Sequence, residues 1–190
     1  RAVYELLLKR LPKGSDVPPA PPLPKWTIQP NSGPPPGGTD PAVSSAARNT
    51  SLNRAVRERV EAGQTDSALK LIARTRSLGN SEAAQLRAEV AQGLFAMNSD
   101  DAALDLAKTA IRDSGGEVGL AAYVAGLAAW RSGHFDDARV FFEATSVATM
   151  ASPSLRAAGS FWAARVHLRS EQSESYKFWL TRAAEESNTF

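Results

Sequence analysis

The chain has 190 residues, with 22 Lys and Arg against 20 Asp and Glu, and it has no cysteine. A sequence without cysteine can form neither a disulfide framework nor a thiolate zinc site. Residues 1–50 carry six basic and three acidic groups, which leaves 16 basic and 17 acidic groups for the remainder. Because that remainder is almost neutral, it lacks the clustered Lys and Arg of nucleic-acid-binding proteins, and we expect no nucleic-acid partner.

The first fifty residues are predicted to hold a short helical segment and a linker. Residues 1–11 have a helical pattern too brief to be stable alone, and eleven of the twelve prolines lie between Pro12 and Pro41. Proline fixes φ and removes an amide donor, so residues 12–49 are predicted to form a Pro/Gly-rich linker with polyproline II character. The alternative is a ligand for an aromatic groove, but we favour the spacer because the composition supplies stiffness without a receptor. Since the chain begins with Arg1, we expect it to be a fragment.

From residue 50 to residue 190 the sequence repeats at intervals of 35 to 37 residues. The same loop starts at Gly63, Asn98, Gly133 and Ser170. Three positions later comes a residue that is expected to cap the next helix, and five positions later a small one: Asp66, Asp101, Asp136 and Ser173, then Ala68, Ala103, Ala138 and Ser175. A fixed interval of this size is typical of stacked helical hairpins, none of which can bury its apolar face alone.

The repeats predict an all-α domain of four antiparallel hairpins in residues 50–190. Apolar residues recur at helical spacing in the second helix of each copy, as at Tyr176, Trp179, Leu180 and Ala183. The expected helices are 52–62 and 67–78, 81–97 and 102–113, 117–131 and 137–148, and 153–169 and 174–187. The longest apolar stretch, Gly119 to Trp130, is shorter than the roughly 18 residues that span a bilayer, so we expect a buried helix and no membrane span.

Aromatic residues are concentrated in the last two hairpins. These aromatic residues are Trp130, Phe135, Phe141, Phe142, Phe161, Trp162, Phe178 and Trp179. They could form a sugar-stacking or peptide-binding surface. Their helical spacing favours packed seams between hairpins instead, because large aromatic side chains dominate core burial.

No catalytic, cofactor-binding or metal-ligating residues are predicted, and no cofactor is expected. His134 is expected in an exposed loop, and His167 lies between Arg165 and Arg169 in the fourth hairpin without an evident carboxylate partner. A metal site or catalytic triad cannot be built from these spacings. The acidic pairs are interpreted as caps and solvated helix faces: Asp100/Asp101, Asp136/Asp137 and Glu185/Glu186.

Three segments resemble a known family. The sequences FWAARVHL (161–168) and YKFWLTRAAEESNTF (176–190) are similar to the end of the superhelical region of soluble lytic transglycosylases. The segment AAYVAGLAAWRSGHFDDARVFFEA (121–144) resembles the tetratricopeptide-like hairpins of the same region. The resemblance implies a right-handed superhelix of antiparallel helical hairpins, a tetratricopeptide-like solenoid. The Pro-rich N-terminal extension, which the composition predicts, departs from that family's superhelix.

The resemblance also implies a function for the parent protein. Members of that family are periplasmic lyases, in which a separate lysozyme-like domain after the superhelix cleaves peptidoglycan glycan strands to 1,6-anhydromuropeptides. Glu186, Ser187 and Phe190 superficially match the family's catalytic motif, but the catalytic glutamate needs a further folded domain, so we expect this chain itself not to be catalytic. The alternative is a tetratricopeptide-like scaffold that binds a protein partner and has no enzyme activity.

Overall fold

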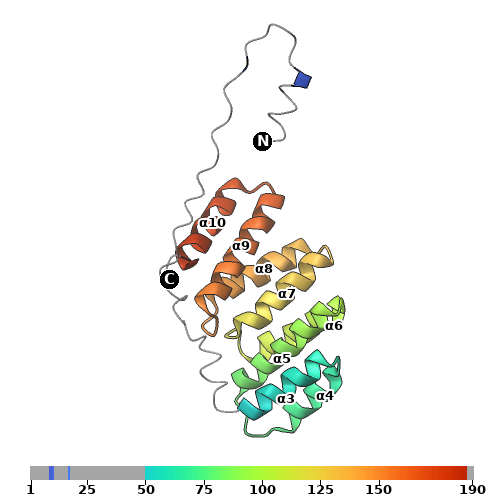
Figure 1. Ribbon diagram of the computed structural model, residues 1–190. Helices are drawn as coiled ribbons and strands as arrows, with labels where there is room; N and C mark the ends of the chain where they lie inside the picture. Colours follow the sequence, from blue (N-terminus) through green and yellow to red (C-terminus); the bar gives the residue numbers. More distant parts are fainter. Residues whose placement is uncertain (1–8, 11–16, 18–49, 188–190) are drawn as a thin grey trace. The chain divides into compact units, whose positions relative to one another are not determined.

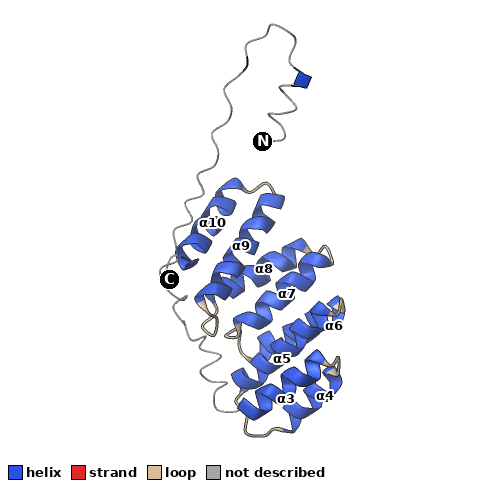
Figure 2. Ribbon diagram, viewed as in Figure 1, coloured by secondary structure: helices blue, strands red, loops and turns tan. Residues whose placement is uncertain are grey.

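A computed structural model of the chain describes residues 9–10, 17 and 50–187. The N-terminal helical segment predicted for residues 1–11 and the linker predicted for residues 12–49 lie outside the described residues, apart from Lys9, Arg10 and Val17, and both stay predictions. Within residues 50–187 the structure has eight helices and no named strand (Figure 2). The all-α fold class is confirmed.

The eight helices form four hairpins, which follow one another along the stack in Figure 1. They are α3 (Thr50–Glu61) and α4 (Thr65–Arg74), α5 (Asn80–Ala96) and α6 (Asp100–Asp113), α7 (Gly119–Arg131) and α8 (Phe135–Val147), and α9 (Pro153–Arg169) and α10 (Ser173–Ser187). The predicted ends are within two residues of these except at α4. That helix stops four residues before the predicted end, because the backbone leaves the helical region at Thr75 (φ −88°, ψ 88°).

The hairpins stack so that their first helices form one layer. Each second helix packs against its own first helix, and α4, α6 and α8 also pack against the first helix of the next hairpin. First helices also contact one another, α3 with α5, α5 with α7 and α7 with α9, whereas second helices do not pack together to any comparable extent in residues 50–187. Because one layer is more tightly spaced than the other, the stack curves toward the first helices, which line its inner side.

The short loop within each hairpin turns through a left-handed residue. Gly63 (φ 73°), Asn98 (φ 61°) and Gly133 (φ 80°) take this conformation, as their residue types predict. In the fourth hairpin the residue is Glu171 (φ 56°) and not Ser170, which is right-handed (φ −88°). The left-handed residues of the last two hairpins are therefore 171 − 133 = 38 positions apart, so the prediction of Ser170 is wrong by one residue.

The predicted capping role of the aspartates is wrong. The N-cap residues of α4, α6 and α8 are Gln64, Ser99 and His134, and none of them forms a side-chain cap hydrogen bond. The helices begin earlier than expected, so Asp66, Asp101 and Asp136 lie inside the first turn, and Ser173 is the first residue of α10. An aspartate there stabilises the helix through the positive end of the helix dipole and not through a cap bond.

Small residues bring the helices close together. Ala68, Ala103 and Ala138 have no exposed surface, as predicted for the position after each loop. Gly159 of α9 lies against the backbone of α8, since a Cβ placed there would come within 3.0 Å of the Phe142 carbonyl oxygen and 2.8 Å of Thr145 Cβ. The core consequently consists largely of alanine, with Phe142 as the largest fully buried side chain.

Loops between hairpins are also linked. Met150 N donates to Glu117 O at 2.9 Å and Gly119 N donates to Met150 O at 3.4 Å, which forms an isolated bridge at Val118. No helix within the described part of the chain is long and apolar enough to cross a membrane.

Candidate functional site

Five aromatic residues of the last two hairpins form a continuous row of ring contacts. Trp130 meets Phe135 and Trp162 edge-on, with ring centroids 5.0 and 5.5 Å apart, and Trp162 stacks on Phe142 at 5.4 Å. Tyr123 meets Phe142 edge-on at 6.1 Å, and burial raises the pKa of the Tyr123 hydroxyl against an opposing hydrogen bond from Trp162. The row joins α7, α8 and α9, so these aromatics hold the seams together, as the sequence predicts.

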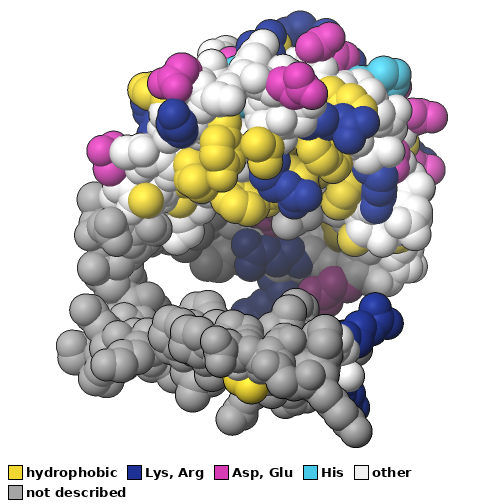
Figure 3. All heavy atoms as spheres, turned by 90° about the horizontal axis from the view of Figure 1, so that it is seen from above, with side chains coloured by type: hydrophobic (Ala, Val, Ile, Leu, Met, Phe, Trp, Pro, Cys, Tyr) yellow, Lys and Arg dark blue, Asp and Glu magenta, His cyan; other side chains and the backbone are white. Residues whose placement is uncertain are grey.

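Two of the predicted seam residues are exposed. Phe161 of α9 is 46% exposed and Phe178 of α10 is 58% exposed, and Leu168 of α9 is 56% exposed. Figure 3 looks down on the end of the stack that α9 and α10 form, and it shows hydrophobic side chains gathered between Lys and Arg side chains. The aromatic residues therefore fall into two groups, one that packs between helices and one that is exposed at the surface.

An open pocket lies beside the aromatic row. Its volume is about 530 Å³, and we call it the aromatic pocket. It is lined by Phe95 at the end of α5, Leu127, Trp130 and Arg131 of α7, Phe135 at the start of α8, and Trp162 and Arg169 of α9. Five of these seven side chains are apolar or aromatic, and the other two are arginines. Such a lining suits an apolar group that carries a negative charge at one end.

Arg131 at the rim of the aromatic pocket is tied to the preceding hairpin. Its guanidinium forms an ion pair with Asp100, donates to Asn98 Oδ1 at 3.1 Å and to Phe95 O at 2.7 Å, and lies 3.9 Å from the Phe95 ring centroid. The hydrogen bond with Asp100 raises the pKa of Arg131 above its ordinary value. The charge of Arg131 is thus matched within the protein, and its role at the rim is structural.

Arg165 and Arg169 of α9 differ from Arg131 because they rest on aromatic rings alone. The Arg169 guanidinium lies 4.0 Å from the Phe135 ring centroid, and that of Arg165 lies 4.6 Å from the Trp162 centroid and 5.6 Å from Trp130. Neither forms an ion pair with any residue that the structure describes. A guanidinium stacked on a ring keeps its N–H edges available for a carboxylate or phosphate.

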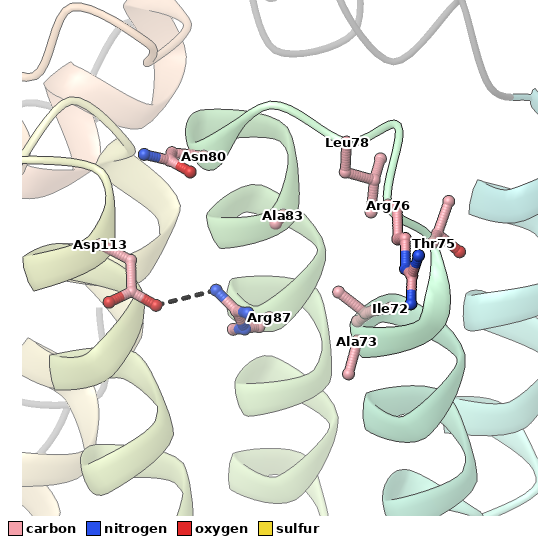
Figure 4. A pocket seen from close by; sticks show the side chains of 9 residues that line it. All are labelled: Ile72, Ala73, Thr75, Arg76, Leu78, Asn80, Ala83, Arg87 and Asp113. Carbon is pink, nitrogen blue, oxygen red and sulfur yellow. Dashed lines mark hydrogen bonds and ion pairs between the residues drawn. The ribbon is translucent and has the colours of Figure 1, made fainter.

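A second pocket lies at the junction of α4 and α5 (Figure 4). It has a volume of about 330 Å³ and includes Arg76, Asn80, Arg87 and Asp113 in its lining. Arg87 Nη1 donates to Asp113 Oδ2 at 2.8 Å, as the dashed line shows. This ion pair already occupies the charged groups of Arg87 and Asp113, and no aromatic side chain is in the lining. The second pocket therefore has fewer groups available to bind a ligand than the aromatic pocket has.

The two histidines lie in different surroundings. His134 is exposed in its loop, as predicted. His167 is buried and has partners that the sequence did not reveal: its Nε2 lies 2.9 Å from Glu143 Oε1 and its Nδ1 lies 2.6 Å from Gln172 Oε1. This network fastens α9 to α8 and lines neither pocket. No group of three or more His, Cys, Asp or Glu in residues 9–10, 17 and 50–187 could hold a metal ion.

Members of two of the acidic pairs form ion pairs that connect helices. Asp100 holds Arg131, and Glu186 pairs with Arg156 at 3.1 Å, which fastens α10 to α9. The Glu186 side chain is 21% exposed, so the glutamate that superficially matches a catalytic motif belongs to the seam between the last two helices.

The stacked antiparallel hairpins define the class of protein: a tetratricopeptide-like repeat solenoid. Solved structures share the arrangement. The crystal structure of MamA matches with a TM-score of 0.55 at 17% identity, covering 77% of this chain and 83% of that chain. The TPR-like repeats of a putative kinesin light chain from Podosopora anserina match with a TM-score of 0.52 at 18% identity, covering 75% and 77%. No family model matches the sequence, and no curated protein matches it either.

Proposed function

We propose that residues 50–187 act as a protein-interaction module whose aromatic pocket binds a segment of a partner protein. The observation that carries this proposal is the meeting of Trp130, Phe135 and Trp162 with two arginines that lack carboxylate partners among the described residues, in and beside one open pocket. Tryptophan and arginine are the residues that most often carry binding energy in protein interfaces.

The position of the aromatic pocket in the fold supports the same function. Leu120, Tyr123, Leu127 and Trp130 recur on α7 at helical spacing, and all four are half-buried. They belong to the layer of first helices, toward which the stack curves. A concave face with an apolar stripe fits an extended or helical peptide, which is the use that solenoids make of their curvature.

Selection from a random peptide library tests the proposal. The purified chain is screened against a display library of 12-residue peptides, and the recovered peptides are measured with a Leu127→Gln variant, which makes the pocket lining polar. The control is Leu69→Gln, a half-buried leucine of α4 that does not line the pocket. We expect recovered peptides to bind the control and to lose affinity for Leu127→Gln. Recovery of no peptide, or equal binding by both variants, would contradict the proposal.

A second candidate function rests on the family resemblance. Two of the segments that resemble soluble lytic transglycosylases lie within α9 and, up to residue 187, within α10, and the third spans most of α7 and α8. Of these helices, α9 includes Arg165, Arg169 and the exposed Phe161. In this candidate the chain is the non-catalytic helical region of a periplasmic peptidoglycan lyase. Its surface positions the glycan strand or a downstream lysozyme-like domain.

The second candidate has a direct biochemical test. The gene is read beyond the codon for residue 190, and this chain and the complete product are each incubated with purified peptidoglycan. We expect anhydromuropeptides from the complete product only, because Glu186 is engaged with Arg156 in this chain. If the complete product released no anhydromuropeptides, a lytic transglycosylase would be excluded. If this chain alone released them, the catalytic site would lie within this chain and the second candidate would be wrong.

A further inference from the structure

Two arginines stand one helical turn apart on α9 beside the aromatic pocket. Arg165 and Arg169 are exposed, and their guanidinium groups lie over the rings of Trp162 and Phe135. Residues four apart on a helix are neighbours, so the two positive charges share one face of α9. Like charges at this spacing repel in the free protein, and an anion placed between them removes the repulsion.

The surroundings leave both charges unmatched. Two acidic residues form contacts with other side chains of α9. Glu143 is engaged by His167 at 2.9 Å and by Arg139 at 3.3 Å, and Glu186 is engaged by Arg156 at 3.1 Å. Arg131, which lines the aromatic pocket together with Arg169, is matched by Asp100. The rim of the aromatic pocket therefore carries excess positive charge next to an apolar interior.

Charge complementarity decides between two occupants. The Pro-rich N-terminal segment of the same chain is one, because proline-rich peptides dock on aromatic surfaces. Residues 12–49, however, carry three basic and two acidic groups, and Trp26 directly follows Lys25. Because this segment has no excess of negative charge to pair with the two arginines, an acidic peptide is the better match for the rim.

We propose that the aromatic pocket recognises an acidic peptide segment of a partner protein, one that inserts a single apolar side chain and pairs a neighbouring Asp or Glu with Arg165 and Arg169. This inference rests on the proposed protein-interaction function and names the chemistry of the partner. The apolar side chain enters among Leu127, Trp130 and Phe135. The carboxylate accepts hydrogen bonds from the two guanidinium edges, whose orientation the aromatic rings hold in advance.

The aromatic rings explain why arginine serves here better than lysine. A planar guanidinium stacks on an indole or phenyl face and still presents a fork of N–H donors that matches a carboxylate. An ammonium group would lose both the stacking and the two-point geometry. Replacing both arginines by lysine keeps the charge, and it is therefore expected to give an affinity between those of the original chain and an uncharged variant.

The test uses the random 12-residue library and an uncharged double variant, Arg165→Gln with Arg169→Gln. The matched control is Arg54→Gln with Arg74→Gln, two exposed arginines of α3 and α4 that lie outside the aromatic pocket. We expect the recovered peptides to be enriched in Asp or Glu within three positions of an aromatic or aliphatic residue. In fluorescence anisotropy with one such peptide, the uncharged variant should bind about tenfold more weakly, and the control within about twofold.

The outcomes separate this inference from the function on which it rests. If peptides are recovered without enrichment of acidic residues, or if the uncharged double variant binds them as well as the original chain does, the acidic partner is refuted and the interaction module remains. If no peptide of any kind is recovered, the proposed function itself fails. Added salt gives a further check, because about 0.5 M NaCl should weaken binding by the original chain more than binding by the uncharged variant.

Discussion

The close contact between Gly126 and Phe142 leads to a quantitative prediction about the seam of the third hairpin. A Cβ placed at Gly126 would come within 2.6 Å of Phe142 Cε1 and 2.7 Å of Cδ1. The Phe142 ring has no exposed surface, and Trp162 stacks on it at 5.4 Å. Because the ring is enclosed, it cannot move aside without disturbing Trp162 and Tyr123.

Two opposing effects set the result of Gly126→Ala. Alanine in a helix interior is favoured over glycine by about 1 kcal/mol. An extra methyl group forced into a packed core costs about 1–3 kcal/mol, and a 2.6 Å approach to an enclosed ring belongs at the upper end of that range. We therefore expect a net loss of about 1–2 kcal/mol in the free energy of unfolding.

The substitution Phe142→Leu provides the matched test. Leucine is smaller and leaves space where the ring was, so the added methyl group should fit and Gly126→Ala should become neutral or stabilising in that background. The expected coupling energy is about 2 kcal/mol, measured by urea unfolding of the original chain, both single variants and the double variant. Additive effects within about 0.5 kcal/mol would refute the contact as the cause.

Three further predictions concern other parts of the seams. Ala138→Leu should lower the melting temperature, because Ala138 is fully buried and overpacking costs about 1–3 kcal/mol, whereas Ala102→Leu at an exposed position of α6 should not. Tyr123→Phe should remove part of the alkaline destabilisation. The folded-state pKa of Tyr123 is raised, so its contribution to stability is complete below about pH 10 and is lost as the pH rises through the folded-state pKa. The free energies of unfolding of the original chain and of Tyr123→Phe should therefore change by different amounts between about pH 7 and about pH 11. His167→Leu should cost about 1–3 kcal/mol because it leaves Glu143 without its histidine partner, and an unchanged thermal melt would contradict this.

The sequence predicts the helices well because their pattern is local. A left-handed turn at Gly63 and at Gly133 follows from the residue type, and the apolar stripe of a helix follows from its 3.6-residue period. The sequence does not distinguish a capping aspartate from one inside the first turn, because the two positions are only two residues apart. The left-handed turn at Glu171 was missed because glutamate carries no preference for that conformation.

The aromatic pocket could not be predicted in the same way. Phe95, Trp130 and Trp162 come from three different hairpins, and a period of about 35 residues does not specify how far each hairpin rotates against the next. The partners of His167 are hidden for the same reason, since Glu143 lies 24 residues away in another helix. The one local signal for the site is the spacing of Arg165 and Arg169, four residues apart and next to Trp162.

Some substitutions at the aromatic pocket should lower both the stability of the chain and its peptide affinity, and others should lower the peptide affinity alone. Trp162 stacks on Phe142, meets Trp130 edge-on and also lines the pocket, so Trp162→Ala should cost about 3–5 kcal/mol of stability and should abolish peptide binding as well. Arg169→Gln removes only a solvent-exposed charge stacked on Phe135, so its cost to stability should stay within about 1 kcal/mol while peptide affinity falls. Thermal melts and anisotropy titrations of both variants measure the two effects. If Arg169→Gln destabilised the chain as much as Trp162→Ala does, Arg169 would be a seam residue and could not be assigned to partner binding.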